Sequence, residues 1–278
     1  MLSARVYKAY YELARVESRH SVIELGTGQG ASSIALTAGI VDSGRCARLL
    51  AVDQFSQQNK GPHPASISVD GAATSDINLA AYRKNLHDYG LDQWVDVYPG
   101  KTTEVEIPRD EKGPFDVLVI DIDGYVDRDL ALFYDWIEPN GLIVIDDYRN
   151  TVSNLGKRNL DKFRRMPRGQ VEEKIAALSH YQRGRLLGKQ MLTWRLVERM
   201  KAMGLLRPVR NIDGTLVCRK IGTGSFGSRF TEGASRGVED GVVRDFLHLM
   251  VVGKDQLSIS SSLAFHIRAV GARVLKGQ

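Results

Sequence analysis

Cysteine is scarce in this chain of 278 residues. The two cysteines, Cys46 and Cys218, lie far apart and have no metal-ligand spacing, so we expect neither a disulfide framework nor a cysteine metal site. Long apolar runs are also lacking, since none approaches the roughly 20 residues that cross a bilayer. The first 20 residues contain no uninterrupted apolar core of the kind found in secretion signals. We therefore expect a cytoplasmic protein without a membrane span.

The composition is 43% hydrophobic and 26% charged, which suits one large α/β domain with an extension. The net charge is +5, and the excess of Lys and Arg is concentrated between Arg149 and Arg199. Nucleic acid, an anionic membrane surface or an acidic substrate could each use such a face. A solvated helical surface is the interpretation that we favour.

The most informative stretch runs from Phe115 to Tyr148. It contains two short apolar runs, Val117–Ile120 and Leu142–Ile145, which read as strands buried on both faces. One helical segment joins them, so they form a βαβ unit and end at the same edge of a parallel sheet. Ligands bind at this carboxyl edge in open α/β sheets. The residues that the two strands deliver there are Asp121, Asp123, Asp146 and Asp147.

A glycine-rich segment, Glu24–Gly30, follows the first predicted strand, Ser21–Leu25, and opens a helix at Ala31. Glycines allow a close approach of backbone to ligand, and a helix N-terminus attracts negative charge. The next predicted strand ends in Asp53, at a suitable distance for an acid that binds a ribose. This context favours a nucleoside-bearing cofactor over a plain strand-to-helix turn. The Glu24 carboxylate could accept hydrogen bonds from an ammonium group or fix the loop itself.

The remaining pattern predicts alternating strands and helices and then an antiparallel hairpin. Asp127 or Asp129 is expected to cap the helix between the two acid-bearing strands. His63 lies in a long predicted loop. The expected segments are helix 2–18, loop 54–76, helix 77–89 with Gly90 as its cap, strand 95–98, helix 130–137, helix 191–203, and hairpin strands 205–210 and 215–221.

Together these motifs resemble the class I S-adenosylmethionine-dependent methyltransferases over residues 1–221. The resemblance implies a Rossmann-like, seven-stranded, mostly parallel sheet with an antiparallel last strand and helices on both faces. It also implies S-adenosylmethionine as cofactor. The cofactor-binding residues that it implies are Glu24, Gly26, Thr27, Gly28, Gly30, Ser32, Asp53, Thr102 and Asp121.

Within that superfamily, Asp121, Asp146 and Asp147 are similar to the metal ligands of the metal-dependent O-methyltransferases of the catechol and sugar type. Three clustered carboxylates suit a hard cation, with Mg²⁺ the best match. The alternative is that these acids cap a loop or bind an Arg. Related sugar enzymes often carry a His after the first acid, where this chain has Gly124 and Tyr125. The catalytic candidates are therefore Asp121, Asp123 and Tyr125, with Lys157 and His180 as further candidate bases.

The sequence thus predicts an Mg²⁺-assisted O-methyltransferase that acts on a hydroxyl of a small molecule, such as a sugar or natural product. Residues 149–189 would form a basic, lid-like insertion in domain 1–221, and residues 222–278 an extension of unknown role. A homo-oligomer is compatible with this extension. Two alternatives stay open: a methyltransferase for RNA or protein that uses the basic face, and a non-catalytic binding subunit with a cofactor fold.

Overall fold

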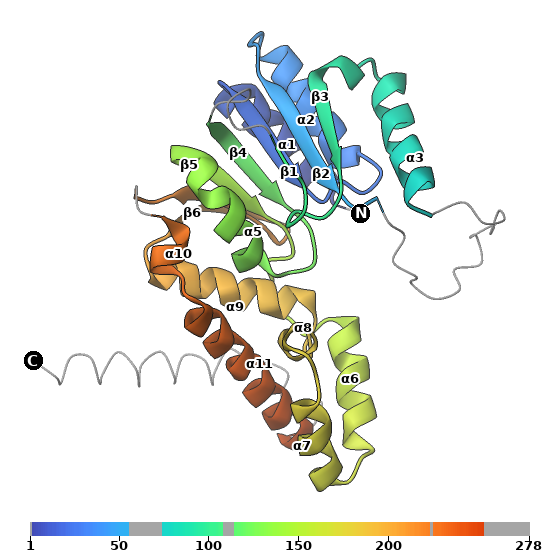
Figure 1. The fold of residues 1–278 in the computed structure, drawn as a ribbon, viewed down its shortest axis with the longest axis vertical. Coiled ribbons are helices and arrows are strands. Elements are labelled where there is room, and N and C mark those ends of the chain that lie inside the picture. The colour runs from blue at the N-terminus through green and yellow to red at the C-terminus, as the bar shows by residue number, and fades with distance from the viewer. Residues whose placement is uncertain (1, 56–73, 108–113, 223–224, 253–278) are drawn as a thin grey trace, which may run out of the picture. The chain divides into compact units, whose positions relative to one another are not determined.

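The computed structural model describes residues 2–55, 74–107, 114–222 and 225–252 (Figure 1). The chain forms two compact units. The first unit consists of Met1–Tyr148 and Leu196–Ser235, and the second consists of Arg149–Arg195 and Arg236–Gln278. The predicted division into 1–221 and 222–278 stays a prediction. His63 and most of the predicted loop 54–76 lie outside the described residues.

The first unit is built on a seven-stranded sheet with the order β3-β2-β1-β4-β5-β7-β6. Neighbouring strands from β3 to β5 are parallel, whereas β7 is antiparallel to β5 and β6 is antiparallel to β7. The predicted fold class and the reversed final hairpin are therefore confirmed. The strands are β1 (Ser21–Leu25), β2 (Arg48–Asp53), β3 (Val95–Pro99), β4 (Phe115–Ile120), β5 (Ile137–Ile145), β6 (Leu206–Ile212) and β7 (Thr215–Lys220).

Helices α1 (Ala4–Glu17), α2 (Ala31–Asp42) and α3 (Thr74–Asp88) share one hydrophobic core with the sheet. The α1 helix forms because its apolar residues recur at helical spacing, and the Ser3 side chain accepts a hydrogen bond from the Val6 backbone to cap its start. Strand β4 is buried along its whole length, as expected for a central parallel strand. A short 3₁₀ turn, η1 (Asp92–Trp94), follows α3.

The segment between β4 and β5 differs from the prediction. Helix α5 (Val126–Phe133) begins and ends four residues before the predicted range, and the 3₁₀ turn η2 (Tyr134–Trp136) follows it. Neither Asp127 nor Asp129 caps this helix, because the N-cap residue is Tyr125 and no side chain makes a capping bond there. Strand β5 begins earlier than predicted, and Asn140 lies within it at φ 67°.

The predicted hairpin is confirmed, with Asp213 and Gly214 at its turn in left-handed conformations of φ 51° and 91°. Two positive φ values are typical of the type I′ turn that an Asp-Gly pair favours. This turn lies at the carboxyl edge of the sheet, because β7 runs antiparallel to β5.

The second unit is helical, and it has its own core. Phe163 and Phe246 pack edge to face in that core, with ring centroids 5.3 Å apart. Residues 222–241, which are rich in glycine, are largely helical in their described part. None of the described helices is both long enough and apolar enough to span a membrane. The remaining helices of the described residues are α6 (Asn154–Arg164), α7 (Arg168–Ala176), α8 (His180–Gly184), α9 (Lys189–Ala202), α10 (Phe226–Arg229) and α11 (Glu232–Val252).

Candidate active site

Strand register places three acids of the first unit, Asp53, Asp121 and Asp146, in one row at the carboxyl edge of the sheet. Glu24 on β1 pairs with Val119 on β4, which pairs with Val144 on β5. Side chains two residues apart on a strand lie on the same face. The row two residues closer to the carboxyl edge therefore lies on the same face of the sheet as Glu24. Its members are Asp53, Gly26, Asp121, Asp146 and Thr215.

Backbone hydrogen bonds extend the sheet ladder into this row. The Asp121 amide donates to the Leu25 carbonyl at 2.9 Å, and the Asp146 amide donates to the Ile120 carbonyl at 3.0 Å. These bonds fix where each acid leaves its strand. The positions of the carboxylates are thus set by the sheet itself rather than by a loop.

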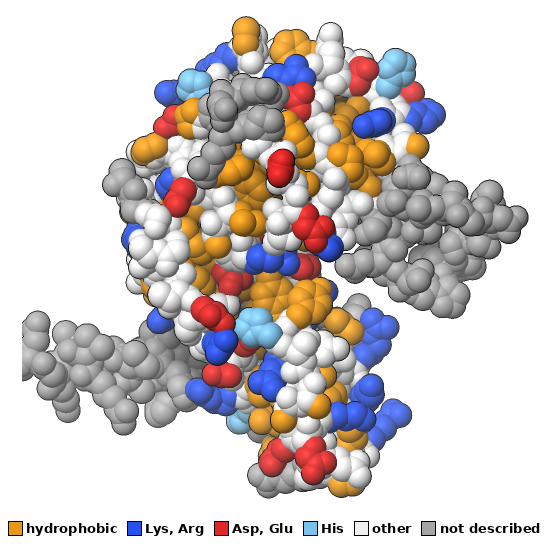
Figure 2. All heavy atoms as spheres, in the orientation of Figure 1, with side chains coloured by type: hydrophobic (Ala, Val, Ile, Leu, Met, Phe, Trp, Pro, Cys, Tyr) orange, Lys and Arg blue, Asp and Glu red, His pale blue; other side chains and the backbone are white. Residues whose placement is uncertain are grey.

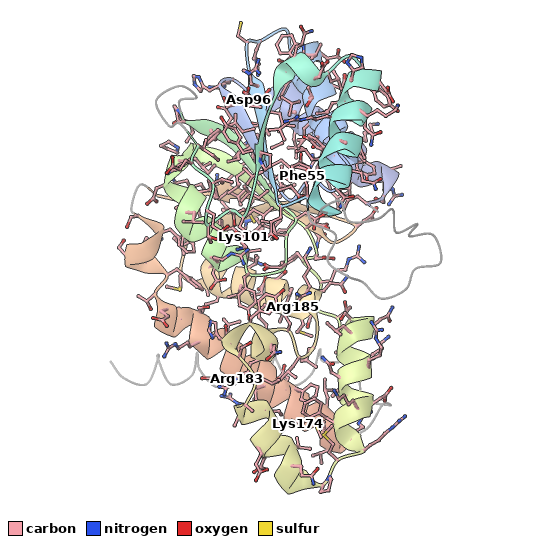
Figure 3. The ribbon with its side chains drawn as sticks, turned by 45° about the vertical axis from the view of Figure 1, so that its right-hand side comes forward. Phe55, Asp96, Lys101, Lys174, Arg183 and Arg185 are labelled. Atoms are coloured by element: carbon pink, nitrogen blue, oxygen red, sulfur yellow. The ribbon has the colours of Figure 1, made fainter. Side chains whose placement is uncertain are left out.

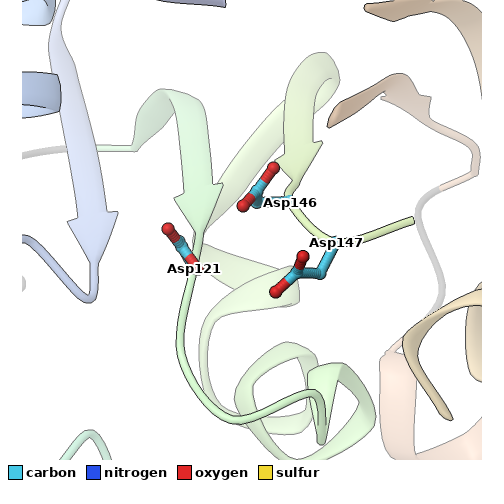
Figure 4. Close-up of side chains that lie close together, drawn as sticks. All are labelled: Asp121, Asp146 and Asp147. Atoms are coloured by element: carbon cyan, nitrogen blue, oxygen red, sulfur yellow. The ribbon is translucent and has the colours of Figure 1, made fainter. Parts of the chain in front are cut away.

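Three of the acids form what we call the edge cluster: Asp121, Asp146 and Asp147 (Figure 4). One carboxylate oxygen from each lies within 4.8 Å of the others, and all three residues are half-buried. Asp147 has a left-handed backbone, with φ 56°, directly after Asp146. This unusual conformation brings two consecutive residues to the same cluster, and Asp is among the residues that tolerate it.

Asp146 is held by a neutral donor. The Thr215 hydroxyl donates a hydrogen bond of 2.6 Å to its Oδ1. Burial raises the pKa of the Asp146 carboxyl, and the charge of Asp121 raises it further. The edge cluster therefore concentrates negative charge that a bound cation would stabilise.

The glycine-rich loop packs directly against the edge cluster. Gly26 has φ 84°, and a Cβ at this position would lie 2.1 Å from the Asp121 backbone oxygen. No other residue fits this contact without a shift of the backbone. Gly30, at φ 93°, is the N-cap residue of α2, and a Cβ there would lie 3.0 Å from the Tyr82 ring. The two glycines bring the loop, the helix N-terminus and Asp121 together.

Asp53 holds the loop from the β2 side. Its Oδ2 accepts hydrogen bonds from the backbone amides of Thr27 at 2.7 Å and Gly28 at 3.0 Å. Its Oδ1 accepts one from the Phe55 amide at 2.7 Å. Three backbone donors orient this carboxylate beside the loop. Its predicted role in binding a ribose stays a prediction.

Glu24 is a buried acid beneath the loop, with 1% of its surface exposed. The Ser33 hydroxyl donates to its Oε2, and Ser32 also hydrogen-bonds this carboxylate, whereas Oε1 has no partner among the described residues. Burial raises the pKa of the Glu24 carboxyl to about 7. A cationic ligand group near Oε1 would keep this carboxylate ionised.

A second group of acids at this edge contains its own cation. We call it the Arg128 cluster: Asp123, Arg128 and Asp129. The Arg128 guanidinium donates to Asp123 Oδ2 at 2.9 Å and to Asp129 Oδ1 at 3.0 Å. The Thr102 hydroxyl also donates to Asp129, at 2.9 Å. Burial raises the pKa of Asp129 to about 6, although Arg128 lowers it.

The structure separates the candidate bases. Asp123 is bound in a bidentate ion pair by Arg128, so its carboxylate would have to leave that pair to accept a proton. Tyr125 is buried at the start of α5. Lys157 and His180 belong to the second unit, where His180 forms an ion pair with Glu239. The catalytic assignments of Asp123 and Tyr125 stay predictions.

Three residues that donate hydrogen bonds to the acids of the site could not be identified from the sequence: Ser33, Thr215 and Arg128. Thr215 could be found by extending the β5 and β7 pairing, but that register depends on the folded hairpin. Ser33 lies one residue from the predicted Ser32, and helix phase decides which hydroxyl is buried. Arg128 lies near the start of a helix, where charged residues are common, so the sequence does not reveal that it binds Asp123 and Asp129.

Residues 23–148 match the family described as a methyltransferase domain. This range contains the glycine loop, Asp53 and the edge cluster. This part of the chain therefore resembles a methyltransferase domain. The match and the strand order confirm the resemblance to class I S-adenosylmethionine-dependent methyltransferases, and with it the prediction of an enzyme.

Solved structures of methyltransferases are similar to this chain at low identity. The O-methyltransferase TomG from Streptomyces achromogenes is 17% identical, with 80% of this chain and 82% of that chain covered and a TM-score of 0.49. An O-methyltransferase from Bacillus cereus is 14% identical, with 80% and 83% covered and a TM-score of 0.48. No curated protein matches the chain.

Proposed function

We propose that this methyltransferase transfers a methyl group from S-adenosylmethionine to a hydroxyl of a small molecule, with assistance from Mg²⁺. A sugar or another natural product is the acceptor class that we propose. The observation that carries the proposal is the juxtaposition of the glycine loop with the edge cluster at Gly26 and Asp121.

The donor set of the edge cluster fits a hard cation. Its donors are carboxylate oxygens, and Asp121 raises the pKa of half-buried Asp146 through the unfavourable charge that a cation would offset. Mg²⁺ takes oxygen ligands, carboxylates among them, and usually keeps several positions for water or substrate oxygens. Asp121, Asp146 and Asp147 would hold it. A bound Mg²⁺ would make a substrate hydroxyl more acidic and hold its oxygen in place.

The residues of the chain would then bind and orient the cofactor. Glu24 Oε1, which has no hydrogen-bond partner among the described residues, would accept a hydrogen bond from the ammonium group of S-adenosylmethionine. Asp53 would bind the ribose, and the loop from Gly26 to Gly30 would let the cofactor approach the backbone. Methyl transfer requires an in-line arrangement of oxygen, methyl and sulfur, so positioning would account for much of the rate.

The first experiment measures cofactor binding and turnover with the full-length protein. Calorimetry should show binding of S-adenosylhomocysteine, and Asp53→Ala should weaken it by at least about tenfold, on the order of one charge-assisted hydrogen bond. Asp88→Ala is the matched control, because it removes an exposed carboxylate at the end of α3. Methyl transfer to a panel of hydroxyl compounds should stop when a chelator is added. Absence of cofactor binding by the wild type would contradict the proposal.

One surface feature favours a second candidate function, methylation of RNA. Lys and Arg side chains lie on the surface of the second unit (Figure 2). Helix α6 and the residue that follows it carry four exposed cations for which no acidic partner is described: Lys157, Arg158, Lys162 and Arg165. Other arginines of this unit have internal partners. Arg183 donates to the carbonyls of Ile175 and Ala176, and Arg185 binds Tyr181 (Figure 3).

Salt dependence distinguishes this second candidate. Neutralising phosphates would release counterions, so RNA affinity should fall steeply between low and moderate salt. The quadruple change of the α6 cations to Glu should then remove both RNA binding and methylation of RNA. Retained turnover of a small hydroxyl compound by that variant would favour the first proposal.

A further inference from the structure

The side chain of Tyr10 on α1 is buried, with 1% of its surface exposed, yet its hydroxyl has no hydrogen-bond partner among the described residues. A buried tyrosine hydroxyl normally has one. None of the roles proposed above uses Tyr10. The position of Tyr10 in the first unit indicates which group its hydroxyl could bind.

The direction of α1 aims the Tyr10 hydroxyl at the carboxyl edge. The start of α1 lies at that edge, because the Ser3 hydroxyl donates to Asp213 Oδ2 at 2.7 Å in the β6–β7 turn. The next residue of that turn, Gly214, accepts a hydrogen bond from the Tyr148 amide at 2.8 Å, directly after the edge cluster. Helical side chains point toward the helix N-terminus. The phenol of Tyr10 thus extends from the core toward the edge cluster.

Tyr10 also lies on the correct face of the sheet. It packs in the core that contains Val119 and Val144. These residues precede Asp121 and Asp146 by two positions on their strands, so all four side chains share a face. Burial raises the pKa of the Tyr10 hydroxyl well above its ordinary value, and the charges of Asp146, Asp121 and Glu24 raise it further. The hydroxyl therefore stays protonated and acts only as a donor toward acids.

We propose that Tyr10 is a positioning residue of the edge cluster, whose hydroxyl donates a hydrogen bond toward Asp146 through a water molecule that accompanies a bound cation. Thr215 already occupies Oδ1 of Asp146, so Tyr10 would support the remaining acceptor capacity. A donor to a carboxylate favours its ionised form, which is the form that binds a cation. The inference rests on the proposed function, because it requires a cation at the cluster.

The test compares Tyr10→Phe with Tyr82→Phe in the full-length protein. Tyr82 is a matched control, since its side chain is fully buried, as that of Tyr10 is. Tyr82 differs from Tyr10 in location, because its ring lies against Gly30. Burial raises the pKa of its hydroxyl most, and the charges of Glu24 and Asp53 raise it further. Calorimetric titrations with MgCl₂ and with S-adenosylhomocysteine report on the two sites separately.

Tyr10→Phe should weaken Mg²⁺ binding by about tenfold, as for loss of an outer-shell hydrogen bond to a ligand. Its S-adenosylhomocysteine affinity and its thermal unfolding without Mg²⁺ should stay at wild-type values. Tyr82→Phe should leave Mg²⁺ affinity unchanged. Equal Mg²⁺ affinity of wild type and Tyr10→Phe would overturn this inference and leave the proposed function intact. Equal losses in both variants would also overturn it, since they would indicate a packing effect.

A wild type that binds S-adenosylhomocysteine but not Mg²⁺ would overturn the metal part of the proposed function, and this inference with it. Should Tyr10→Phe not fold, Tyr10→3-fluorotyrosine supplies the second variant. It keeps the hydroxyl and the packing, so Mg²⁺ affinity should stay within about twofold of the wild type, which is well under the 1.4 kcal/mol of a tenfold change. A tenfold loss in this variant would overturn the inference.

Discussion

Two groups of acids at the same sheet edge differ in what neutralises them. In the Arg128 cluster, a guanidinium lies between Asp123 and Asp129 and donates hydrogen bonds to both. Asp146 and Glu24 instead receive their described side-chain hydrogen bonds from hydroxyls, those of Thr215 and of Ser32 and Ser33. Hydroxyl donors satisfy an acceptor but supply no opposite charge.

In our proposal, this difference separates acids that stabilise the fold from acids that bind a ligand. The Arg128 cluster is complete within the chain, and it ties the start of α5 to Thr102. Glu24 is buried and Asp146 half-buried, both have raised pKa values, and each would be stabilised by a positive group from outside. In our proposal the ammonium of the cofactor serves Glu24, and Mg²⁺ serves Asp146.

Breaking the Arg128 cluster should have the largest effect on stability. Arg128→Met leaves Asp129, which is 1% exposed, without its cation, and should lower the free energy of unfolding by about 3 kcal/mol at pH 8. Without Arg128 the pKa of Asp129 rises further from about 6, so this carboxyl is neutral at pH 5. Stability should therefore partly return at pH 5. Urea denaturation at both pH values measures this.

Arg83→Met serves as the control for that experiment, because Arg83 is exposed on α3 and should change stability by less than about 0.5 kcal/mol. A cost for Arg128→Met below that of the control at pH 8 would contradict the description of a charge-neutralised cluster.

Removing a ligand charge from the edge cluster should abolish cation binding. Asp146→Asn should weaken Mg²⁺ binding and methyl transfer by at least about 100-fold, because affinity follows the number of charged ligands. Affinity for S-adenosylhomocysteine should stay within about threefold, which is less than 1 kcal/mol. Asp123→Asn is the matched control from the Arg128 cluster, and calorimetry should show unchanged Mg²⁺ affinity. If both substitutions had the same effect, the two groups would not differ as described.

Glu24 should make the ligand-free protein less stable as the pH rises. Its folded pKa of about 7 lies above the unfolded value of 4.5, so the folded state binds the proton more tightly. Stability is then lost as the pH rises from 4.5 through 7. Glu24→Gln should remove this loss and be more stable than the wild type by about 3 kcal/mol at pH 8 but not at pH 4.5.

Denaturant titrations of the ligand-free proteins at the two pH values test this, with exposed Glu106→Gln as the control. A stability difference between Glu24→Gln and the wild type that does not change with pH would mean that Glu24 is already paired in the chain.

The smallest expected effect belongs to the neutral donor of the edge cluster. Thr215→Val removes the hydroxyl that donates to Asp146, and should weaken Mg²⁺ binding by about tenfold, as for loss of an outer-shell hydrogen bond to a ligand. Thr193→Val removes another buried hydroxyl, one without a described partner, and should leave Mg²⁺ affinity unchanged. Mg²⁺ titration calorimetry compares the two variants, and equal affinities would exclude a role for Thr215.

Much of the sheet and its acids could be predicted from the sequence. Buried parallel strands are continuous apolar runs, so β1, β2, β4 and the end of β5 are legible, and the residues that follow them must share an edge. The Asp213-Gly214 pair also identifies the hairpin, because these two residues favour the left-handed conformations of a tight turn. Asp121 and Asp146 were therefore predicted at their observed places in the fold.

Side-chain pairing across long sequence separations could not be predicted. Asp129 was expected to cap a helix, but its carboxylate binds Thr102, which lies 27 residues away. Thr215 reaches Asp146 only through the antiparallel register of β5 and β7. The described glycine-rich residues after Gly222 are largely helical, against the weak helix propensity of glycine, because tertiary packing overrides propensity.

A crystal structure with Mn²⁺ and S-adenosylhomocysteine tests the central claim most directly, since Mn²⁺ can take the place of Mg²⁺ at an oxygen site and gives an anomalous signal. We predict one anomalous peak about 2 Å from oxygens of the edge cluster. The same structure should place the cofactor ammonium beside Glu24 Oε1. Bound cofactor with no peak at Asp121, Asp146 and Asp147 would contradict the account.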